Sequence, residues 1–422
     1  MKTGKYRWFL SGLGVAAAAS LASCGGGDNC ESCYVGSGSG GSGSGTSYAS
    51  DVSYGLVVGD FGGNALGSSV IETSALDGRA PNAGQLNVYL ATGPSTYAAP
   101  TAVATGNQPL YLASADFDRN GLPDVVSANS QDGELEVFLN GSGGTPGIFA
   151  APIVLDSPGA SQLAVADMNG DGLPDIVSAD FNVSLFEQTT PGVFANPISL
   201  YSGGANWVAV GDLDHDGIPD VALVDGAGVH LVFHTGAAGV NTYSAATLIY
   251  QESSDVAAVG ANVVAIADVN GDGYDDLIIT DPGPAGKNTP FVSIMLQNPA
   301  SPGSFAAPVP YATAPGSQAY SILVQDIDGD GLPDIIIGGS TAVSVLVNQP
   351  GAAGTFYAAD NYAASDTFQI AIADVNGDGL PDIVTTTGVS HTLSNGAYQN
   401  EPGVLLQNPS NVGFFTALQD LP

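Results

Sequence analysis

The chain has 422 residues, of which 44% are hydrophobic, and it contains 58 glycines and 26 prolines. Only 6 residues are Lys or Arg against 41 Asp or Glu, so the formal net charge is −35. Nucleic acids and anionic membrane surfaces are bound through clustered basic side chains, and this charge argues strongly against both as partners. The apolar fraction suffices for a large core, and the turn-rich composition favours an all-β fold.

The first 23 residues have the layout of a secretion signal. Three basic residues within the first seven precede a short, mostly apolar segment at 9–19, which is typical of a signal peptide. Residues 21–24 (Leu-Ala-Ser-Cys) resemble the lipobox of bacterial lipoproteins. This resemblance implies that Cys24 becomes the lipidated first residue of the mature protein, although a cleaved signal with an incidental cysteine is the alternative. We therefore expect a lipid-anchored protein of the bacterial cell envelope, at the outer membrane or cell surface or in the periplasm.

Residues 24–47 are rich in Gly and Ser, and we interpret them as a flexible tether. They contain Cys30 and Cys33 as a C-x-x-C pair. A redox or zinc role would need further ligands or a βαβ context that the sequence lacks, so a small-loop disulfide or no role in folding is favoured. No later stretch is long and apolar enough to span a bilayer, and we expect membrane contact only through the lipid anchor. Without residues 1–23 the chain keeps 3 basic and 41 acidic residues, a formal charge of −38.

A nine-residue acidic motif, D-x-[DN]-x-[DN]-G-x-x-D, occurs six times. Side-chain oxygens at positions 1, 3, 5 and 9 and the backbone carbonyl at position 7 can surround a Ca²⁺ ion, while the Gly at position 6 permits the sharp turn. The predicted ligands are Asp116, Asp118, Asn120, Leu122, Asp124; Asp167, Asn169, Asp171, Leu173, Asp175; Asp212, Asp214, Asp216, Ile218, Asp220; Asp268, Asn270, Asp272, Tyr274, Asp276; Asp326, Asp328, Asp330, Leu332, Asp334; and Asp374, Asn376, Asp378, Leu380, Asp382. We expect about six calcium ions, because each loop otherwise crowds three or four carboxylates into one turn.

The main alternative for such a loop is an EF-hand, which requires a Glu at position 12 and a helix on either side. None of the six copies has an acid at position 12, where the residues are Ser127, Ser178, Leu223, Ile279, Ile337 and Thr385. The flanking segments, such as 163–166 and 175–177, are short apolar runs rich in β-branched residues, as is typical of buried strands. Each loop is therefore predicted to join two adjacent strands.

The acidic loop belongs to a larger unit that recurs seven times from about residue 50. After the loop and its second strand come a third apolar run, for example 135–139 or 343–347, and a Gly-x-Phe turn into a fourth segment. The first unit has a degenerate loop at Asp60, in which Gly62 takes position 3 and Ser68 position 9, and we expect it to hold calcium poorly. Four strands in about 40–50 residues are typical of a β-propeller blade. A parallel β-helix is the main alternative, but its repeats are usually shorter.

The loops, the strand runs and the G-x-F-x-x-P segments resemble FG-GAP/VCBS repeats, the units of integrin-α-type β-propellers. The resemblance covers residues from about 50 to the end of the chain. It implies that residues 48–422 form an all-β, seven-bladed β-propeller of four-stranded antiparallel blades. It also implies that Ca²⁺ binds between the first two strands of most blades, on the face opposite the usual ligand-binding face. The loop at Asp116 departs from the pattern through Arg119 and the neutral Asn120, and we expect it to be the weakest calcium site of the six.

The sequence offers little for catalysis. It lacks the nucleophile-elbow, zinc-protease and phosphate-loop motifs. His230 and His234 are four apart on a predicted strand and hence on one face, but no third ligand accompanies them, and partial burial is favoured over metal binding. Glu134 and Glu136 could be imagined as a glycosidase pair, although their spacing alone gives this no support.

Trp207 and Tyr320 stand just before the first strands of their units. Aromatic side chains there could stack on a sugar at the ligand-binding face, or pack between blades, which we favour. Taken together, the sequence predicts a non-enzymatic, calcium-stabilised cell-envelope lipoprotein that binds or adheres to a protein or polysaccharide. The alternative is a calcium-dependent carbohydrate-active enzyme, a polysaccharide lyase or hydrolase. Lyase chemistry usually neutralises the charge of a uronate, and the three remaining basic residues count against it.

Overall fold

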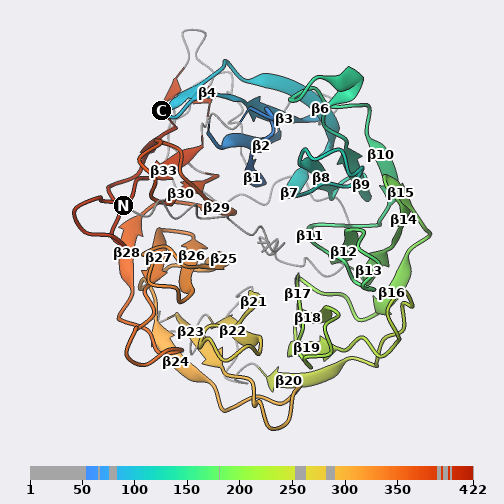
Figure 1. Ribbon diagram of the computed structural model, residues 1–422, viewed down its shortest axis with the longest axis vertical. Helices are drawn as coiled ribbons and strands as arrows, with labels where there is room; N and C mark the ends of the chain where they lie inside the picture. Colours follow the sequence, from blue (N-terminus) through green and yellow to red (C-terminus); the bar gives the residue numbers. More distant parts are fainter. Residues whose placement is uncertain are drawn as a thin grey trace, which may run out of the picture.

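The computed structural model describes residues 54–64, 67–75, 83–179, 181–251, 263–281, 290–386, 391–392, 398–399 and 402–421. These residues form seven four-stranded antiparallel sheets arranged as blades around a central axis (Figure 1). The predicted seven-bladed β-propeller is therefore confirmed. The predicted signal peptide, the lipidation residue Cys24 and the tether with Cys30 and Cys33 lie outside the described residues. Within these residues no helix is long and apolar enough to cross a membrane.

Each blade runs outward from the axis in chain order. The strands of blades 1 to 4 are β1 (Leu56–Gly59), β2 (Ser69–Ala75), β3 (Ala83–Tyr89) and β6 (Thr101–Asn107); β7 (Pro109–Ala115), β8 (Asp124–Asn129), β9 (Glu134–Phe138) and β10 (Ile153–Asp156); β11 (Gln162–Ala166), β12 (Asp175–Ala179), β13 (Val183–Phe186) and β16 (Ile198–Tyr201); and β17 (Trp207–Gly211), β18 (Asp220–Asp225), β19 (Gly228–Val232) and β20 (Thr247–Gln251).

Blades 5 to 7 repeat the same order. Their strands are β21 (Val264–Ala267), β22 (Asp276–Asp281), β23 (Phe291–Met295) and β24 (Val309–Ala312); β25 (Ala319–Gln325), β26 (Asp334–Gly339), β27 (Ala342–Leu346) and β28 (Asp360–Ala363); and β29 (Ile370–Ala373), β30 (Asp382–Thr385), β33 (Gly403–Leu405) and β34 (Gln419–Asp420). Short hairpins are formed by β4 (Ala91–Gly93) with β5 (Thr96–Tyr97), β14 (Gln188–Thr190) with β15 (Val193–Phe194), and β31 (His391–Thr392) with β32 (Tyr398–Gln399), and η1 (Ser142–Gly144) is a 3-10 turn.

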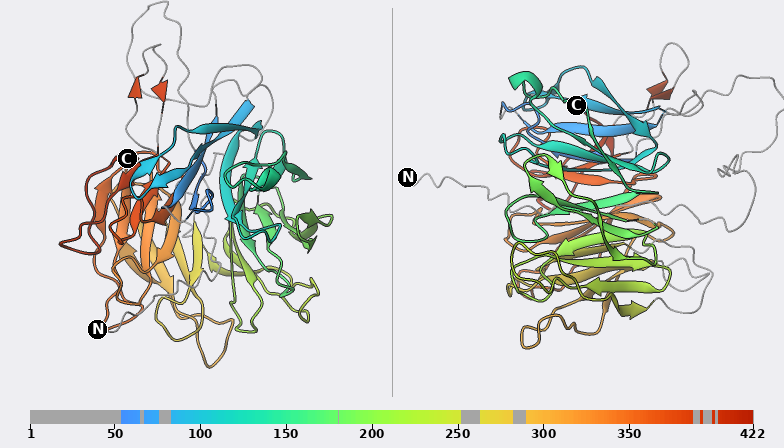
Figure 2. Two further views of the ribbon diagram at one scale, coloured as in Figure 1. Left: turned by 45° about the horizontal axis from the view of Figure 1, so that its top comes forward. Right: turned by 90° about the vertical axis from the view of Figure 1, so that its right-hand side faces the viewer.

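The strands span the thickness of the disc, so that the turns gather on its two faces (Figure 2). In an antiparallel blade the turn between strands 1 and 2 lies on the same face as the turn between strands 3 and 4. The acidic loops are all of the first kind, joining β7 to β8, β11 to β12, β17 to β18, β21 to β22, β25 to β26 and β29 to β30. The prediction that each loop joins two adjacent strands is therefore confirmed.

Burial explains why the second strands are mostly apolar. Every residue of β8, β22 and β26 is buried, because neighbouring blades cover both faces of a blade near the axis. The outer strands β10 and β28 instead alternate between half-buried and exposed residues, as expected where solvent reaches one face. An apolar run in the sequence thus indicates a strand near the axis, and an alternating pattern indicates an outer strand.

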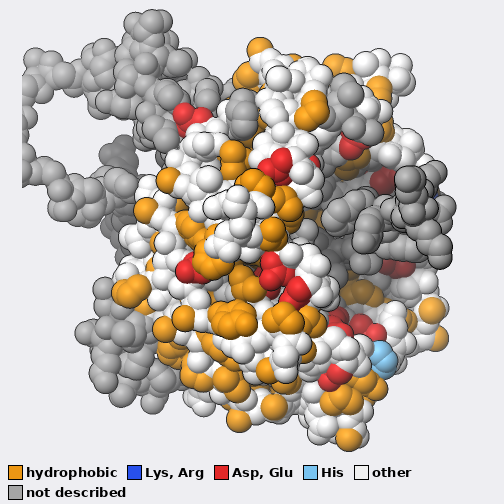
Figure 3. Space-filling view, turned by 60° about the vertical axis from the view of Figure 1, so that its left-hand side comes forward, with side chains coloured by type: hydrophobic (Ala, Val, Ile, Leu, Met, Phe, Trp, Pro, Cys, Tyr) orange, Lys and Arg blue, Asp and Glu red, His pale blue; other side chains and the backbone are white. Residues whose placement is uncertain are grey.

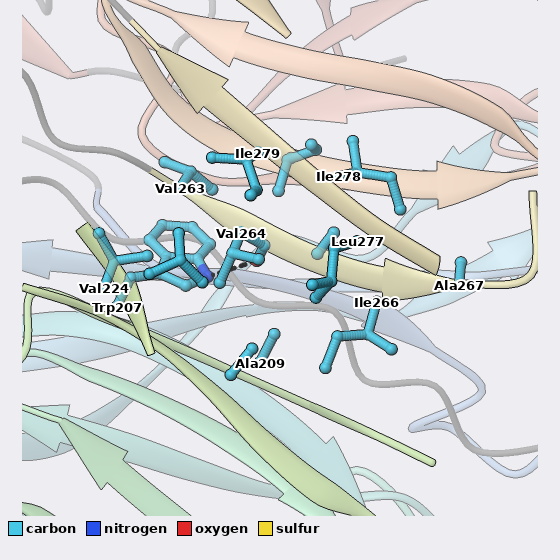
Figure 4. Packing of buried hydrophobic residues seen from close by; sticks show 14 of the residues in the cluster. Trp207, Ala209, Val224, Val263, Val264, Ile266, Ala267, Leu277, Ile278 and Ile279 are labelled. Atoms are coloured by element: carbon cyan, nitrogen blue, oxygen red, sulfur yellow. Dashed lines mark hydrogen bonds between the residues drawn. The ribbon is translucent and has the colours of Figure 1, made fainter. Parts of the chain in front are cut away.

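Trp207 packs between blades rather than at a ligand face. It is the first residue of β17 and only 1% exposed. Its indole Nε1 donates to the Val264 carbonyl of β21 in the next blade at 2.8 Å. Val224 and Val263 belong to the same buried cluster (Figure 4). The packing interpretation is confirmed for this residue.

The ring closes by packing rather than by exchange of a strand. The last blade supplies its own outer strand, β34, from the end of the chain. One buried cluster joins Leu56 of the first blade to Ala371 and Val384 of the last. The buried Gln369 reinforces this contact, since its Oε1 accepts the Leu56 N–H at 2.8 Å and its Nε2 donates to the Leu112 carbonyl at 2.9 Å. Gln369 thereby links the last blade to both the first and the second.

Candidate metal centres

The six acidic loops share one hydrogen-bonded geometry. The position 1 carboxylate accepts the N–H of the position 6 Gly at 2.6–3.0 Å. The position 3 side chain accepts the N–H of position 5 at 2.8–3.2 Å. The position 5 side chain accepts the N–H of position 7 at 2.8–3.0 Å. The position 6 glycines have φ of 86–93°, a conformation that is costly for other residues. The side chains predicted as ligands at positions 1, 3 and 5 are thus gathered over one tight turn.

The aspartate at position 9 has a second role that the sequence analysis missed. It is 0% exposed in all six loops. One carboxylate oxygen accepts the N–H of position 2 of its own loop at 2.7–3.1 Å. The other oxygen accepts an N–H from the turn between strands 3 and 4 at 2.7–2.8 Å. We call this arrangement the aspartate clasp, formed by Asp124, Asp175, Asp220, Asp276, Asp334 and Asp382.

Burial also shifts the ionisation of the clasp aspartates. It raises the pKa of Asp124 and Asp382 to about 6 and the pKa of Asp220 to about 8. The pKa values of the other three lie at about 7 for the same reason. Neighbouring loop carboxylates raise these pKa values further, and the backbone N–H groups lower them. A cation placed among these carboxylates would favour the ionised form.

Three of the six loops bring carboxylates together closely enough to hold a metal ion. In each, one oxygen from positions 1, 3 and 9 lies within 4.8 Å of the other two. These groups are Asp116, Asp118 and Asp124; Asp212, Asp214 and Asp220; and Asp326, Asp328 and Asp334. The remaining loops carry an amide at position 3, at Asn169, Asn270 and Asn376. Carboxylate and amide oxygens are ligands that suit Ca²⁺.

Arg119, which interrupts the loop at Asp116, turns away from it. Its guanidinium donates to the carbonyl of Gly172 in the next acidic loop. The Asn120 amide nitrogen donates to Asp118 Oδ2 at 3.1 Å and to the Asn140 carbonyl at 2.8 Å. The expectation that this loop is the weakest site remains a prediction, but its carboxylates are grouped as closely as in the loops at Asp212 and Asp326.

The first loop keeps the turn but loses the acids. Asp60 Oδ1 accepts the Asn64 N–H at 3.1 Å, as the position 1 carboxylates do elsewhere. Gly59 pairs with Ser69 where Ala115 pairs with Asp124 in the next blade. The assignment of Ser68 to position 9 was therefore wrong, because this loop is one residue longer. Ser69 Oγ accepts the Ala91 N–H at 3.1 Å, so a neutral hydroxyl replaces half of the aspartate clasp.

In blades 2 to 7 a polar residue stands two positions after the third strand, and in blades 2, 6 and 7 it ties neighbouring loops together. The Asn140 amide donates to the Pro123 carbonyl at 3.1 Å in its own blade and to the Phe61 carbonyl at 3.0 Å in the preceding blade. Asn348 and Gln407 make the same pair of contacts in blades 6 and 7. The equivalent residues are Asn140, Gln188, His234, Gln297, Asn348 and Gln407. A sequence signal could have identified these six residues: Asn, Gln or His recurs ahead of each Gly-x-Phe or Gly-containing turn.

The structure does not bring the candidate histidine pair together. The prediction that His230 and His234 share one strand was wrong, because β19 ends at Val232. His230 Nδ1 lies 3.5 Å from Asp225 Oδ1, whereas His234 lies in the following turn against the Val240 carbonyl.

Glu136 is held in a hydrogen-bond network. Its Oε2 accepts bonds from the Thr105 hydroxyl at 2.6 Å, the Gly106 N–H at 2.9 Å and the Asn129 amide at 2.9 Å. These three bonds hold the Glu136 carboxylate in one position.

Tyr320 lies in an aromatic cluster at the other face. Its ring stacks on Phe368 with a centroid distance of 5.0 Å and an interplanar angle of 21°. Tyr54 packs against the same Phe368 ring at 4.9 Å. All three residues are half-buried and stand at or just before first strands, at the end opposite the acidic loops. We call Tyr54, Tyr320 and Phe368 the aromatic cluster.

The fold and its acidic loops define a repeat-built β-propeller. The model of the FG-GAP-like repeat matches residues 116–178, 268–337 and 326–385. The chain is thus a seven-bladed β-propeller that contains FG-GAP-like repeats.

Solved structures resemble the chain in fold. A crystal structure of a protein from Lactobacillus plantarum has a TM-score of 0.51 at 11% identity, covering 82% of this chain and 93% of that one. BBS1N, in its complex with ARL6DN, gives 0.46 at 11% identity, covering 81% and 89%. The Photorhabdus luminescens Tc holotoxin pore gives 0.33 at 15% identity and covers 78% of this chain but 17% of that one. No curated protein matches the sequence.

Two aspartates of one loop should behave differently when substituted: the clasp aspartate at position 9 and the aspartate at position 5. In Asp334→Asn an amide N–H faces a backbone N–H, so we expect a loss of about 2 kcal/mol of stability even in EGTA. Asp330→Asn, at position 5, should leave stability in EGTA nearly unchanged and weaken only the response to Ca²⁺. Urea unfolding of both variants with and without Ca²⁺ measures this, and equal losses in EGTA would contradict the clasp.

Proposed function

We propose that this protein is a non-enzymatic, calcium-stabilised binding module of the bacterial cell envelope, with a protein or polysaccharide as partner. The observation that carries the proposal is the shared geometry of six acidic loops on one face of the ring. Such loops stabilise a scaffold and leave the opposite face available for recognition. An FG-GAP propeller is consistent with a binding module.

Calcium is the simplest source of positive charge for these loops. Arg119 is the only Lys or Arg among the described residues. Acidic side chains recur among apolar ones on the described surface seen in Figure 3, where no Lys or Arg side chain is visible. Carboxylates within 4.8 Å of one another repel strongly unless they are protonated or bound to a cation. We infer about six Ca²⁺ ions, held by the ligands at positions 1, 3, 5, 7 and 9 of each loop.

The connections between strands are more uniform from blade to blade on the acidic face than elsewhere. On the acidic face, the clasps and the inter-blade amide bonds fix the turns. Between the second and third strands, the chain has many more residues in blades 5 and 7 than in blades 4 and 6. Variable connections on a rigid scaffold are where recognition residues concentrate. The aromatic cluster of the opposite face adds half-buried rings of the kind that contact sugars and proteins.

Calcium should stabilise the protein, and its effect should grow with pH. In EGTA, the clasp aspartates have folded pKa values of about 6 to about 8, above the ordinary value of an unfolded Asp. The folded state then binds more protons, so stability in EGTA should fall as pH rises from about 4 to about 8. Saturating Ca²⁺ should reverse this trend, because each site adds about 2.7 kcal/mol at a free concentration of 100 Kd.

Thermal melting from pH 5 to pH 8, with and without EGTA, measures this prediction, alongside the calcium stoichiometry. Five or six ions per chain and a large difference in melting temperature at pH 8 are expected. A melting temperature unchanged by EGTA would sink the calcium proposal, whatever the protein binds on its other face.

The binding role predicts retention without turnover. On immobilised neutral polysaccharides, and on candidate envelope proteins, the calcium-loaded protein should be retained intact and release no sugar. Tyr320→Ala should lower retention at least several-fold while leaving the calcium stoichiometry unchanged. Phe414→Ala is the matched control, since Phe414 is 40% exposed in a turn of the acidic face. Release of reducing or unsaturated sugars would instead support the lyase or hydrolase alternative.

The envelope location rests on the lipobox-like residues 21–24. Lipidation at Cys24 should place the protein in the detergent phase after partitioning of cells, and Cys24→Ser should move it to the aqueous phase. Aqueous partitioning of the unaltered protein would rule out the lipid anchor and leave the propeller as a freely secreted module.

A further inference from the structure

His234 is the one imidazole among the equivalent residues, which otherwise carry amide side chains. Its side chain is 0% exposed. The ring Nε2 lies 2.9 Å from the Val240 carbonyl, so Nε2 carries the proton and donates to that oxygen. In the neutral imidazole this leaves Nδ1 as the acceptor. Within the described part of the chain, Nδ1 has no hydrogen-bond partner.

The inter-blade bond that Asn140, Asn348 and Gln407 make is supplied by a different residue in blade 4. In blade 6 the Asn348 amide donates to the Val269 carbonyl of the preceding loop at 2.7 Å. In blade 4 the Tyr243 hydroxyl donates to the Met168 carbonyl of the preceding loop at 3.0 Å. The Tyr243 ring also packs edge-on against the His234 imidazole, with centroids 5.4 Å apart. His234 is thereby positioned without being needed for the inter-blade contact.

The free nitrogen faces the acidic loop that begins at Asp212. His234 Nδ1 lies 4.0 Å from Asp216 Oδ2, the side chain at position 5. The backbone N–H of His234 donates to Asp220 Oδ1, the clasp aspartate, at 2.7 Å. Oxygens of Asp212, Asp214 and Asp220 lie within 4.8 Å of one another. A buried imidazole nitrogen therefore lies 4.0 Å from one carboxylate of a loop that carries four.

We propose that the loop at Asp212, together with His234 Nδ1, is a mixed oxygen–nitrogen site for a late first-row divalent transition ion such as Zn²⁺ or Co²⁺. This inference rests on the proposed function, because it takes the acidic loops to be cation sites. Loops built from oxygens alone suit Ca²⁺, whereas an imidazole nitrogen raises affinity for zinc and its neighbours. One of the six sites would then carry a different metal from the rest.

The distances are compatible with a single ion between the nitrogen and the loop. Zn–N and Zn–O bonds of about 2.0–2.2 Å place two ligand atoms about 3–3.5 Å apart at tetrahedral or octahedral angles. The 4.0 Å between Nδ1 and Asp216 Oδ2 is therefore closed by a small rotation of the partly exposed Asp216 side chain. The hydrogen bond to Val240 keeps the imidazole in place during this movement.

The chain contains its own matched control. The loop at Asp326 has aspartates at positions 1, 3, 5 and 9, as the loop at Asp212 does. Its carboxylates are grouped with the same 4.8 Å limit. The residue equivalent to His234 is Asn348, whose amide nitrogen is committed to backbone carbonyls. His234→Asn therefore gives the loop at Asp212 the surroundings of the loop at Asp326. The fold already accepts Asn at the equivalent position of that blade.

The experiment is a Co²⁺ titration of the full-length protein in excess Ca²⁺, followed by visible absorption. We expect one Co²⁺ per chain that excess Ca²⁺ does not displace and that Zn²⁺ does. In His234→Asn the Co²⁺ affinity should fall by about tenfold or more, with the remaining calcium stoichiometry unchanged. The unaltered protein loaded with Co²⁺ should also show a paramagnetically shifted, slowly exchanging imidazole N–H in its ¹H NMR spectrum, a readout that needs no substitution.

Two further variants make the result specific. His230→Asn removes a histidine whose Nδ1 lies beside Asp225, and His215→Asn removes one whose ring packs at a tilt against Tyr274. Both variants should keep the Co²⁺ site. Equal Co²⁺ affinity in His234→Asn and the unaltered protein, or no shifted imidazole N–H, would overturn this inference while leaving the calcium sites intact. Failure of every loop to bind Ca²⁺ would instead overturn the proposed function, whether or not Co²⁺ binds.

Discussion

The blades depend on a buried carboxylate that both of its neighbouring turns require. Each clasp aspartate is 0% exposed and joins the loop between strands 1 and 2 to the turn between strands 3 and 4. Burial opposes its charge, while the backbone N–H groups and any bound cation favour it. Folding and proton binding are therefore coupled through the same six side chains, and the proposed metal binding would be coupled to both. The coupling explains how a chain with so few basic residues can keep its acidic loops in tight turns.

The acidic face is also where the blades are tied to one another. The amide of Asn140 bridges its own loop to the Phe61 carbonyl of the preceding blade, and Asn348 and Gln407 do the same further round. A rearrangement of one loop on metal binding thus reaches the next blade through a single hydrogen bond. Ring closure uses no exchanged strand, so these bonds and the buried packing around Gln369 carry the cohesion that strand exchange would otherwise provide.

Local sequence patterns predicted much of this architecture. The features that they missed depend on contacts between segments distant in the chain. The seven units and the strand–loop–strand arrangement follow from apolar periodicity and from the spacing of Asp and Gly in the motif. Ser69 could not be placed by counting, because its equivalence to the clasp position comes from pairing with Gly59 across the blade. The role of Gln369 could not be predicted from its local sequence, because its partners lie in blades that are distant in the chain. His230 and His234 were misassigned because the end of β19 lies between them.

The comparison of two loops shows how metal preference can be set outside the motif. The loops at Asp212 and Asp326 offer the same four carboxylates in the same hydrogen-bonded turn. They differ in the residue that follows the third strand, an imidazole in one and an amide in the other. An amide nitrogen donates hydrogen bonds and repels a cation, whereas a neutral imidazole can offer a lone pair. Because the backbone of that residue is already held by the clasp, a change of side chain there alters the ligand set without disturbing the turn. A repeat protein can in this way vary the chemistry of one blade while the scaffold, and the face that meets a partner, stay the same.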